Sequence, residues 1–155
     1  MLRMLTSDDV LRGQLLLGIA VSLLNITIHA LIITRLTVAT RNASYRFRST
    51  GAQIRAVLIL TTSVAILMFA HCIEVTIWAS TYVLTHAVKD DADALYFAFV
   101  NYTTLGYGDI VPINPWRILG PVAAMNGILL FGWSTAVIYE ILRTLHEGSD
   151  KPSGT

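Results

Sequence analysis

The stretch Thr103-Thr104-Leu105-Gly106-Tyr107-Gly108-Asp109 is the part of the sequence that decides the fold. It follows a short segment of helical character, residues 93–102, which Asp93 is placed to cap, and it precedes an apolar stretch that begins near Trp116. Gly106 and Gly108 can adopt backbone conformations that are closed to other residues, so consecutive carbonyl groups can point in one direction. A Gly-Tyr-Gly triplet alone also occurs in ordinary turns. Between a short helix and a membrane-length apolar stretch, the seven residues favour a loop lined by backbone oxygens.

Such a loop can hold a dehydrated cation when several copies surround one axis. Four loops would stack their carbonyl oxygens into rings that replace the water around K⁺. Each chain supplies one loop, so a closed ring requires a homotetramer with cyclic symmetry. The sequence therefore predicts K⁺ as the bound ion, with the Thr104 hydroxyl forming the innermost ring. The expected ion-binding residues are Thr104, Leu105, Gly106, Tyr107 and Gly108.

The seven residues resemble the signature filter of potassium channels. Downstream, Trp116 and then Met125-Asn126-Gly127-Ile128-Leu129-Leu130-Phe131-Gly132 resemble the inner helix of the small bacterial potassium channels that have two spans. The resemblance runs from His71 to the end of the chain, and residues 1–50 lie outside it. It implies an all-α membrane protein with a tetrameric pore that conducts K⁺ passively, in which residues 93–102 form a re-entrant pore helix.

The resemblance also implies a set of residues that support the filter. Leu105 stands where the commonest filter of the family has Val, a change that leaves the ion-binding carbonyl in place. The aromatic side chains of the pore helix would form a cuff that keeps the filter at its diameter. The cuff residues are Tyr96, Phe97, Phe99 and Tyr102, and Thr103 and Asp109 flank the filter as further supports.

Asp109 has no obvious partner in the sequence. Members of the family commonly brace this residue with a Glu or a Trp from the pore helix. The matching positions hold Val100 and Phe97, whose side chains form no hydrogen bonds. The remaining candidates are Tyr96, a neighbouring subunit or water.

The composition places most of the chain in a membrane. Of the 155 residues, 54% are hydrophobic and 14% are charged, whereas a soluble domain has about 25% charged residues. The net charge of +1 provides no basic surface for nucleic acid. We find no paired carboxylates, no nucleophile with a base and no metal-ligand spacing, so neither an enzyme nor a cofactor is expected.

Three apolar stretches are long enough to cross a bilayer, which takes about 20 residues. They are residues 13–34, 56–88 and 118–139. The loop between the first two contains five arginines and no acidic residue, which predicts that it is cytoplasmic. The N-terminus and the filter would then be outside and the C-terminus inside. Anionic lipid is a candidate partner of this loop, at Arg41, Arg46 and Arg48.

Several polar residues interrupt the first two spans. Ser22, Asn25 and His29 share one face of a helix, which should turn toward protein because polar groups in lipid are costly. Glu74 is the only acidic residue in these spans, with His71 one turn away as the expected partner. A titrating gate and a structural hydrogen bond to the pore helix or to His71 both remain open for Glu74. Trp78 and Tyr82 are expected at the outer membrane interface.

The candidate gating residues lie on the third span and beyond it. Gly127 is equally consistent with a hinge, which the resemblance implies, and with close helix packing. Gly132 is a further gating candidate, with close helix packing as its alternative role. Glu140 and His146 could crowd near the four-fold axis and respond to protons, or they could be a solvated helix end.

These observations predict three regions. Residues 1–53 would hold the N-terminal span and the arginine-rich loop, and residues 143–155 a short cytoplasmic tail. Residues 54–142 would form the pore domain, with an outer helix, the pore helix, the filter and an inner helix over residues 116–142. Two alternatives to a K⁺-selective channel are a weakly selective cation channel and a non-conducting membrane subunit that modulates a partner.

Overall fold

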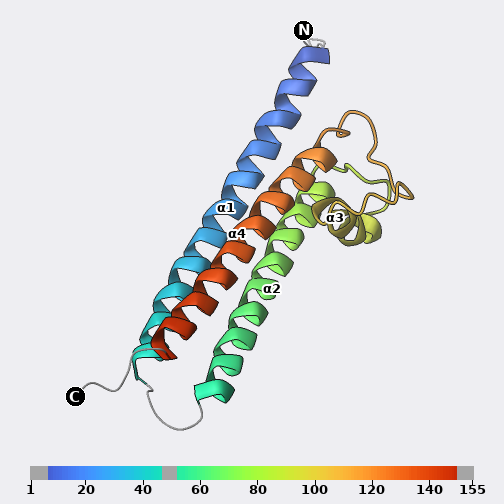
Figure 1. Ribbon diagram of the computed structural model, residues 1–155. Helices are drawn as coiled ribbons and strands as arrows, with labels where there is room; N and C mark the ends of the chain where they lie inside the picture. Colours follow the sequence, from blue (N-terminus) through green and yellow to red (C-terminus); the bar gives the residue numbers. More distant parts are fainter. Residues whose placement is uncertain (1–6, 47–51, 150–155) are drawn as a thin grey trace, which may run out of the picture. The chain divides into compact units, whose positions relative to one another are not determined.

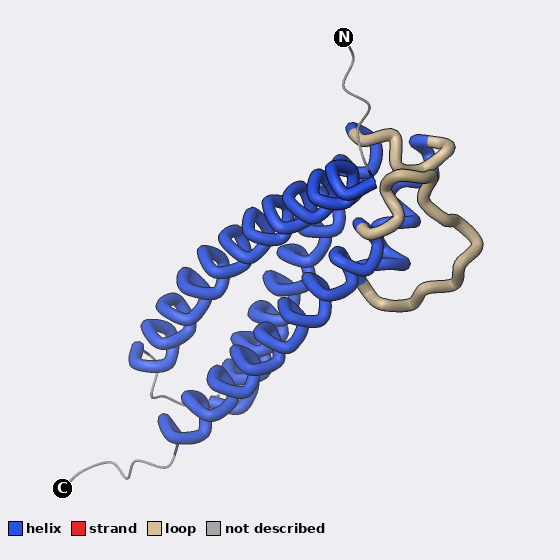
Figure 2. Tube along the Cα trace, turned by 90° about the horizontal axis from the view of Figure 1, so that it is seen from above, coloured by secondary structure: helices blue, strands red, loops and turns tan. Residues whose placement is uncertain are grey.

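The computed structural model describes residues 7–46 and 52–149, and every regular element in these residues is a helix (Figure 1). Three long helices, α1 (Ser7–Arg46), α2 (Ala52–Leu84) and α4 (Leu119–Ser149), account for most of the chain. The short helices η1 (Asp91–Asp93) and α3 (Ala94–Tyr102) lie between α2 and α4. Figure 2 shows the loop that links α3 to α4, which contains the filter residues 103–109.

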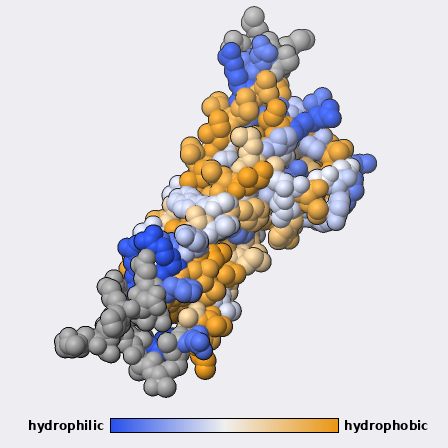
Figure 3. Space-filling view, in the orientation of Figure 1, coloured by the Kyte–Doolittle hydropathy of each residue, from blue (hydrophilic) through white to orange (hydrophobic). Residues whose placement is uncertain are grey.

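The three long helices are the expected membrane spans. Each is long and apolar enough to cross a bilayer, over Asp8–Asn42, Gln53–Leu84 and Leu119–His146. Figure 3 shows apolar residues over much of the visible helix surface, as a lipid-facing surface requires. The all-α membrane fold with three transmembrane helices is therefore confirmed.

The helix ends differ from those expected. α1 extends well beyond residues 13–34 at both ends, because polar residues outside the bilayer continue a helix without lengthening its apolar run. α4 begins at Leu119, whereas the inner helix was expected to begin at residue 116. Trp116 precedes this helix and follows a turn, and its backbone N–H donates to the carbonyl of Ile113 at 2.9 Å.

The described residues form two compact units. The first, which we call the filter unit, comprises residues 7–27 and 72–130. The second, which we call the three-helix unit, comprises residues 28–46, 52–71 and 131–149. Each long helix contributes one segment to each unit.

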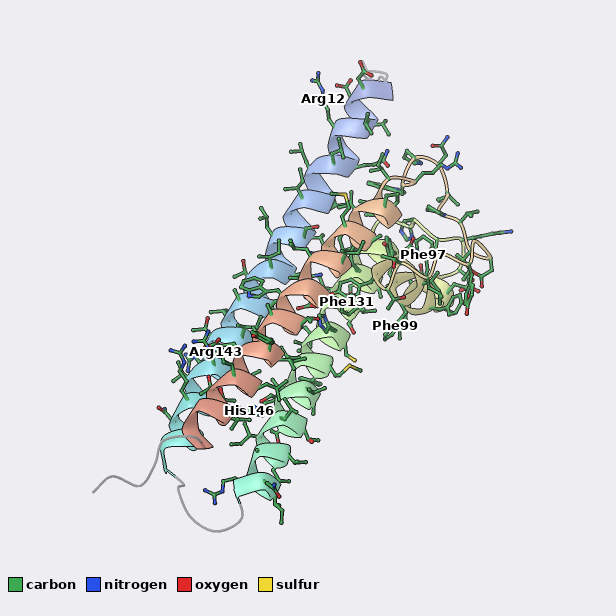
Figure 4. The ribbon with its side chains drawn as sticks, viewed as in Figure 1. Arg12, Phe97, Phe99, Phe131, Arg143 and His146 are labelled. Carbon is green, nitrogen blue, oxygen red and sulfur yellow. The ribbon has the colours of Figure 1, made fainter. Side chains whose placement is uncertain are left out.

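The core of the filter unit is aromatic. Trp78 and Tyr82 of α2 are wholly buried, and Tyr82 packs edge-on against Phe97 of α3 at a ring distance of 4.9 Å. The expectation that Trp78 and Tyr82 mark the outer membrane interface is therefore wrong. The physical reason is that α3 folds back onto this face of α2 and covers it with protein. Figure 4 labels Phe97 and Phe99, which differ in environment: Phe97 is buried and Phe99 is exposed.

The three-helix unit has a smaller aliphatic core. Ile33 and Leu36 of α1 pack with Leu67 of α2 and Ile141 of α4. Near this core, the carboxylate of Glu140 lies 3.7 Å from Arg41 and 3.9 Å from Arg143. Both ion pairs are solvent-exposed, so each contributes little to stability.

Candidate functional site

The pore helix begins differently from the sequence expectation. Asp93 was expected to cap it, but Asp93 has helical backbone angles (φ −83°, ψ −12°) and its side chain makes no capping hydrogen bond. A capping residue needs an extended backbone to reach the free N–H groups. Asp90 has that conformation, and its carboxylate accepts from the backbone N–H of Ala92 at 3.0 Å. The side-chain cap therefore lies at Asp90, which precedes η1, and α3 itself has none.

The end of the pore helix leads directly into the filter loop. The backbone N–H of Thr104 donates to Asn101 O at 2.9 Å, and that of Gly106 donates to Val100 O at 3.2 Å. These bonds hold the inner part of the loop against the last turn of α3.

The backbone of the filter loop alternates in handedness. Thr104, Gly106 and Gly108 have positive φ values of 62°, 60° and 76°. Leu105 and Tyr107, which lie between them, do not. In an extended strand successive carbonyls point to opposite sides. Alternating left- and right-handed residues instead turn successive peptide groups the same way, which is the arrangement that a column of oxygen ligands requires.

Thr104 is the unexpected member of this pattern. A β-branched residue with positive φ is a genuine outlier, and such strain costs about 1–3 kcal/mol. The strain is retained where surrounding contacts over-determine it, and such positions cluster at functional sites. No local propensity would have predicted this conformation for a threonine.

Two glycines of α4 let the inner helix contact the pore helix. A Cβ atom on Gly127 would overlap the backbone carbonyl of Tyr102. A Cβ atom on Gly120 would lie 2.8 Å from the Asn101 side chain, whose Nδ2 donates to Phe97 O at 2.8 Å. The sequence left two roles open for Gly127, a hinge and close helix packing. The geometry matches close packing. Gly132 has open space around the position of a Cβ atom.

Glu74 of α2 bonds to the pore helix. The Tyr102 hydroxyl donates to Glu74 Oε2 at 2.5 Å, and both side chains are fully buried. Tyr102 is thus held at two points: its hydroxyl bonds Glu74 of α2, and its backbone carbonyl packs against Gly127 of α4. This is the structural role proposed for Glu74, with Tyr102 as the partner on the pore helix; His71 as a partner stays a prediction.

A second buried polar junction joins α1 to the same region. Asn25 Nδ2 donates to Asn126 Oδ1 at 3.1 Å and to the backbone oxygen of Glu74 at 3.3 Å. Trp78 Nε1 donates to the same Asn126 oxygen at 3.1 Å. The expectation that the polar face of the first span turns toward protein is confirmed for Asn25 and His29, which are fully buried.

Asp109 at the outer end of the filter has a partner from the pore helix. The Tyr96 hydroxyl donates to Asp109 Oδ2 at 2.7 Å, so one of the three open candidates is present in the subunit itself. This hydrogen bond is the main cause that lowers the pKa of Asp109, and the same bond raises the pKa of Tyr96. Val100 and Phe97 are both buried, and Phe97 belongs to the core of the filter unit.

Tyr96→Phe is expected to raise the pKa of Asp109, because the hydrogen bond that stabilises the carboxylate is lost. Because the pKa of Asp109 is lower in the folded protein than its unfolded value of about 3.9, the bonded carboxylate contributes stability at any pH above that unfolded value. This contribution is lost as the pH falls through the lowered pKa. In the variant the loss begins at a higher pH. The measurement is cation flux as the external pH is lowered, with Tyr139→Phe as a control on an exposed tyrosine. Identical pH profiles for Tyr96→Phe and the wild type would contradict this role.

The cuff residues divide into two pairs. Phe97 and Tyr102 are buried within the subunit, whereas Tyr96 and Phe99 are each 42% exposed. In the filter loop itself, the side chains of Thr103, Leu105 and Tyr107 are exposed as well. A single chain thus buries two of the four aromatic side chains of the predicted cuff and leaves the other two exposed at its surface.

The remaining candidates lie in the three-helix unit. Glu140 pairs with two arginines, which offsets the like-charge crowding expected for it. His146 is exposed, and its Nδ1 lies 3.0 Å from the Leu142 carbonyl oxygen. Figure 4 labels Arg143 and His146 on α4. Of the arginines expected to meet lipid, Arg41 pairs with Glu140, and the Arg46 side chain and all of Arg48 lie outside the described residues.

Sequence reasoning missed two polar residues of the filter unit that form hydrogen bonds through their side chains. Asn101 and Asn126 were not singled out, although both are amides in apolar helices. A polar side chain in such a helix needs a hydrogen-bond partner. That signal could have identified both residues, but not the partners that they bond.

Comparisons with known proteins found a matching family model and several relatives that are similar over part of the chain. A family model described as "Ion channel" matches residues 57–144. A voltage-gated potassium channel of Aeropyrum pernix is 31% identical over 68 residues, which cover 43% of this chain and 23% of the relative. A two-pore potassium channel 5 of Arabidopsis thaliana is 45% identical over 49 residues, which cover 32% of this chain and 10% of the relative. The voltage-gated potassium channel regulatory subunit KCNG3 of Mus musculus is 33% identical over 95 residues, which cover 54% of this chain and 22% of the relative.

The matched stretch spans less than a quarter of the length of each of these relatives. No solved structure matches the chain significantly. The family match includes α3, the filter loop and most of α2 and α4, and it leaves α1 outside.

Proposed function

This chain belongs to the ion-channel family, and we propose that four copies of it form a K⁺-selective pore that conducts passively across a membrane. The observation that carries the proposal is the alternating backbone handedness at Thr104, Gly106 and Gly108. That alternation supports a column of carbonyl oxygens, and four copies would close each level of the column into a ring.

Conduction then follows from the filter residues. K⁺ exchanges its water for rings of oxygens from Thr104, Leu105, Gly106 and Tyr107, with Gly108 at the outer end. Several sites of moderate affinity let one ion push the next, so binding does not prevent exit. The C-terminal end of α3 adjoins the start of the filter, and its partial negative charge favours a cation there.

The tetramer places α4 next to the axis, α2 outside it and α1 at the periphery. Two sets of exposed apolar residues support this arrangement. Met125, Ile128 and Leu129 of α4 are exposed in the filter unit, and so are Tyr96 and Phe99 of α3. Neighbouring subunits and the ion pathway account for such surfaces, which a single subunit leaves uncovered.

The proposed topology has the N-terminus and the filter outside and the C-terminus in the cytoplasm. Residues 54–142 form the pore domain, and the arginine-rich loop, with Arg41, Arg46 and Arg48, faces anionic lipid on the cytoplasmic side. The gating candidates are Gly127, Gly132, His71, Glu74, Glu140 and His146.

The test is ion flux through the purified protein in liposomes. K⁺ is compared with Na⁺ at two pH values, with and without barium. K⁺-selective flux that barium blocks is the expected result. Equal K⁺ and Na⁺ flux would replace the proposal with a weakly selective cation channel. Absence of flux at both pH values would favour a non-conducting subunit that modulates a partner.

A further inference from the structure

Three polar side chains meet inside the three-helix unit, one from each long helix. They are His29 of α1, His71 of α2 and Ser134 of α4. His29 and Ser134 are buried, and His71 is half-buried. None of the sequence patterns that point to the ion pathway includes Ser134, and the filter loop lies in the other unit. The proposed ion pathway therefore does not account for this cluster of polar side chains.

The two imidazoles converge on one point. His29 Nε2 lies 3.2 Å and His71 Nε2 lies 3.0 Å from the same Ser134 Oγ. The two rings are 5.1 Å apart. Aromatic rings fix their orientation, since Phe131 lies 4.6 Å from His71 and Trp133 lies 5.8 Å from His29.

The chemistry of this arrangement suits a metal ion. A hydroxyl has one proton and two lone pairs, so it can donate to one imidazole and accept from the other while both are neutral. Neutral imidazole is the form that binds metals. The ring nitrogens of His29 and His71 lie within 4.8 Å of each other, so small side-chain rotations bring both to bonding distance of one ion.

We propose that His29 and His71 form a binding site for a divalent transition-metal ion of the Zn²⁺ type, with Ser134 as an oxygen ligand or as an outer hydrogen-bond partner. Imidazole nitrogens favour Zn²⁺, Cu²⁺ and Ni²⁺, whereas Mg²⁺ and Ca²⁺ favour oxygen ligands. Water completes the coordination. The ion links α1, α2 and α4, and it therefore restrains α4, the helix that the proposed function places next to the pore.

The sequence provides a matched control, because the chain has four histidines. His86 and His146 are both exposed, and His86 has a positive φ of 50° that asparagine tolerates. The variant His86→Asn/His146→Gln keeps only the proposed ligands, and His29→Gln/His71→Gln keeps only the exposed pair.

Zn²⁺ binding to the full-length protein in detergent is measured by calorimetry, with Mg²⁺ as the control ion. We expect one Zn²⁺ per subunit for the wild type and for His86→Asn/His146→Gln, and an affinity weaker by roughly 100-fold for His29→Gln/His71→Gln. Ser134→Ala is expected to weaken binding about tenfold, as the loss of a supporting group does. Equal Zn²⁺ affinity in the two double variants would overturn the proposal.

A second measurement does not depend on the folding of a variant. Co²⁺ in a four-coordinate nitrogen and oxygen site gives strong visible absorption, which octahedral Co²⁺ in solution lacks. The wild-type protein should show this absorption and lose it to Zn²⁺ in a one-to-one exchange. Its absence at saturating Co²⁺ would also overturn the proposal.

The effect of Zn²⁺ on flux rests on the proposed channel function. Zn²⁺ should inhibit K⁺ flux through the wild-type protein and through His86→Asn, a chelator should reverse the inhibition, and His29→Gln/His71→Gln should be insensitive. Zn²⁺ binding without any K⁺ flux would contradict the channel and leave the site intact. K⁺ flux with Zn²⁺ binding that is independent of the histidine pair would contradict the site and leave the channel intact.

Discussion

Gly106→Ala is expected to abolish K⁺ flux and to leave the tetramer assembled. Gly106 has φ of 60°, and the nearest atom to an added Cβ is Thr104 O at 3.9 Å, so the obstacle is conformational and not steric. A left-handed conformation costs an L-residue roughly 1–2 kcal/mol, which amounts to roughly 4–8 kcal/mol over four copies. Since about 1.4 kcal/mol is a factor of ten, the filter geometry becomes rarer by roughly three to six orders of magnitude.

The matched control for this variant is Gly13→Ala. Gly13 lies in α1 with no atom within 4 Å of an added Cβ, and its φ is not positive. The measurement is liposome flux, together with the mass of the detergent-solubilised assembly. Unchanged flux in Gly106→Ala would contradict the assignment of residues 103–109 as the filter. A tetramer that dissociates would show that Gly106 acts on assembly.

Gly127→Ala is expected to destabilise the assembled protein. The added Cβ would overlap the carbonyl of Tyr102, and backbone on both sides leaves no flexible side chain to move aside. Overpacking of this kind costs about 1–3 kcal/mol per site, and it recurs in every subunit. The expected result is a lower temperature of tetramer dissociation in detergent, with reduced flux because the end of the pore helix is displaced.

Gly132→Ala provides the comparison on the same helix. An added Cβ has open space there, and alanine favours a helix over glycine by about 1 kcal/mol. The dissociation temperature should therefore stay the same or rise. If Gly127→Ala kept wild-type stability and changed only the rate of opening, Gly127 would be a hinge and the packing interpretation would be wrong.

The parts of this protein that follow from local sequence were predictable. An apolar run of membrane length specifies a helix in lipid wherever it occurs, because unpaired backbone groups are too costly there. The glycines at 106 and 108 indicated the filter loop for a similar reason, since backbone freedom belongs to the residue itself. The polar face with Asn25 and His29 was predicted to face protein, because a polar group in an apolar helix has to find a partner.

The buried hydrogen bonds of the filter unit depended on contacts between distant residues, and the sequence did not specify them. Tyr102 bonds Glu74, which is 28 positions away, and Asn126 bonds Asn25, which is 101 positions away. A helical pattern shows that a residue is polar and on which face it lies, but not which element covers that face. For this reason Trp78 and Tyr82 were assigned to the lipid interface and Asp93 to the helix cap.

The sequence by itself therefore determined three spans, a short helix between the second and third spans and a loop whose glycines adopt positive φ, because each depends on properties of consecutive residues. Only the tertiary structure decided that Thr104 adopts a left-handed backbone. It also decided that the carbonyl of Tyr102 occupies the space where a side chain at position 127 would begin, and that Glu74 bonds Tyr102 of α3. The reason is that α3 packs against both α2 and α4. Packing between elements fixes a strained residue and selects hydrogen-bond partners, and neither is encoded in any single stretch of the chain.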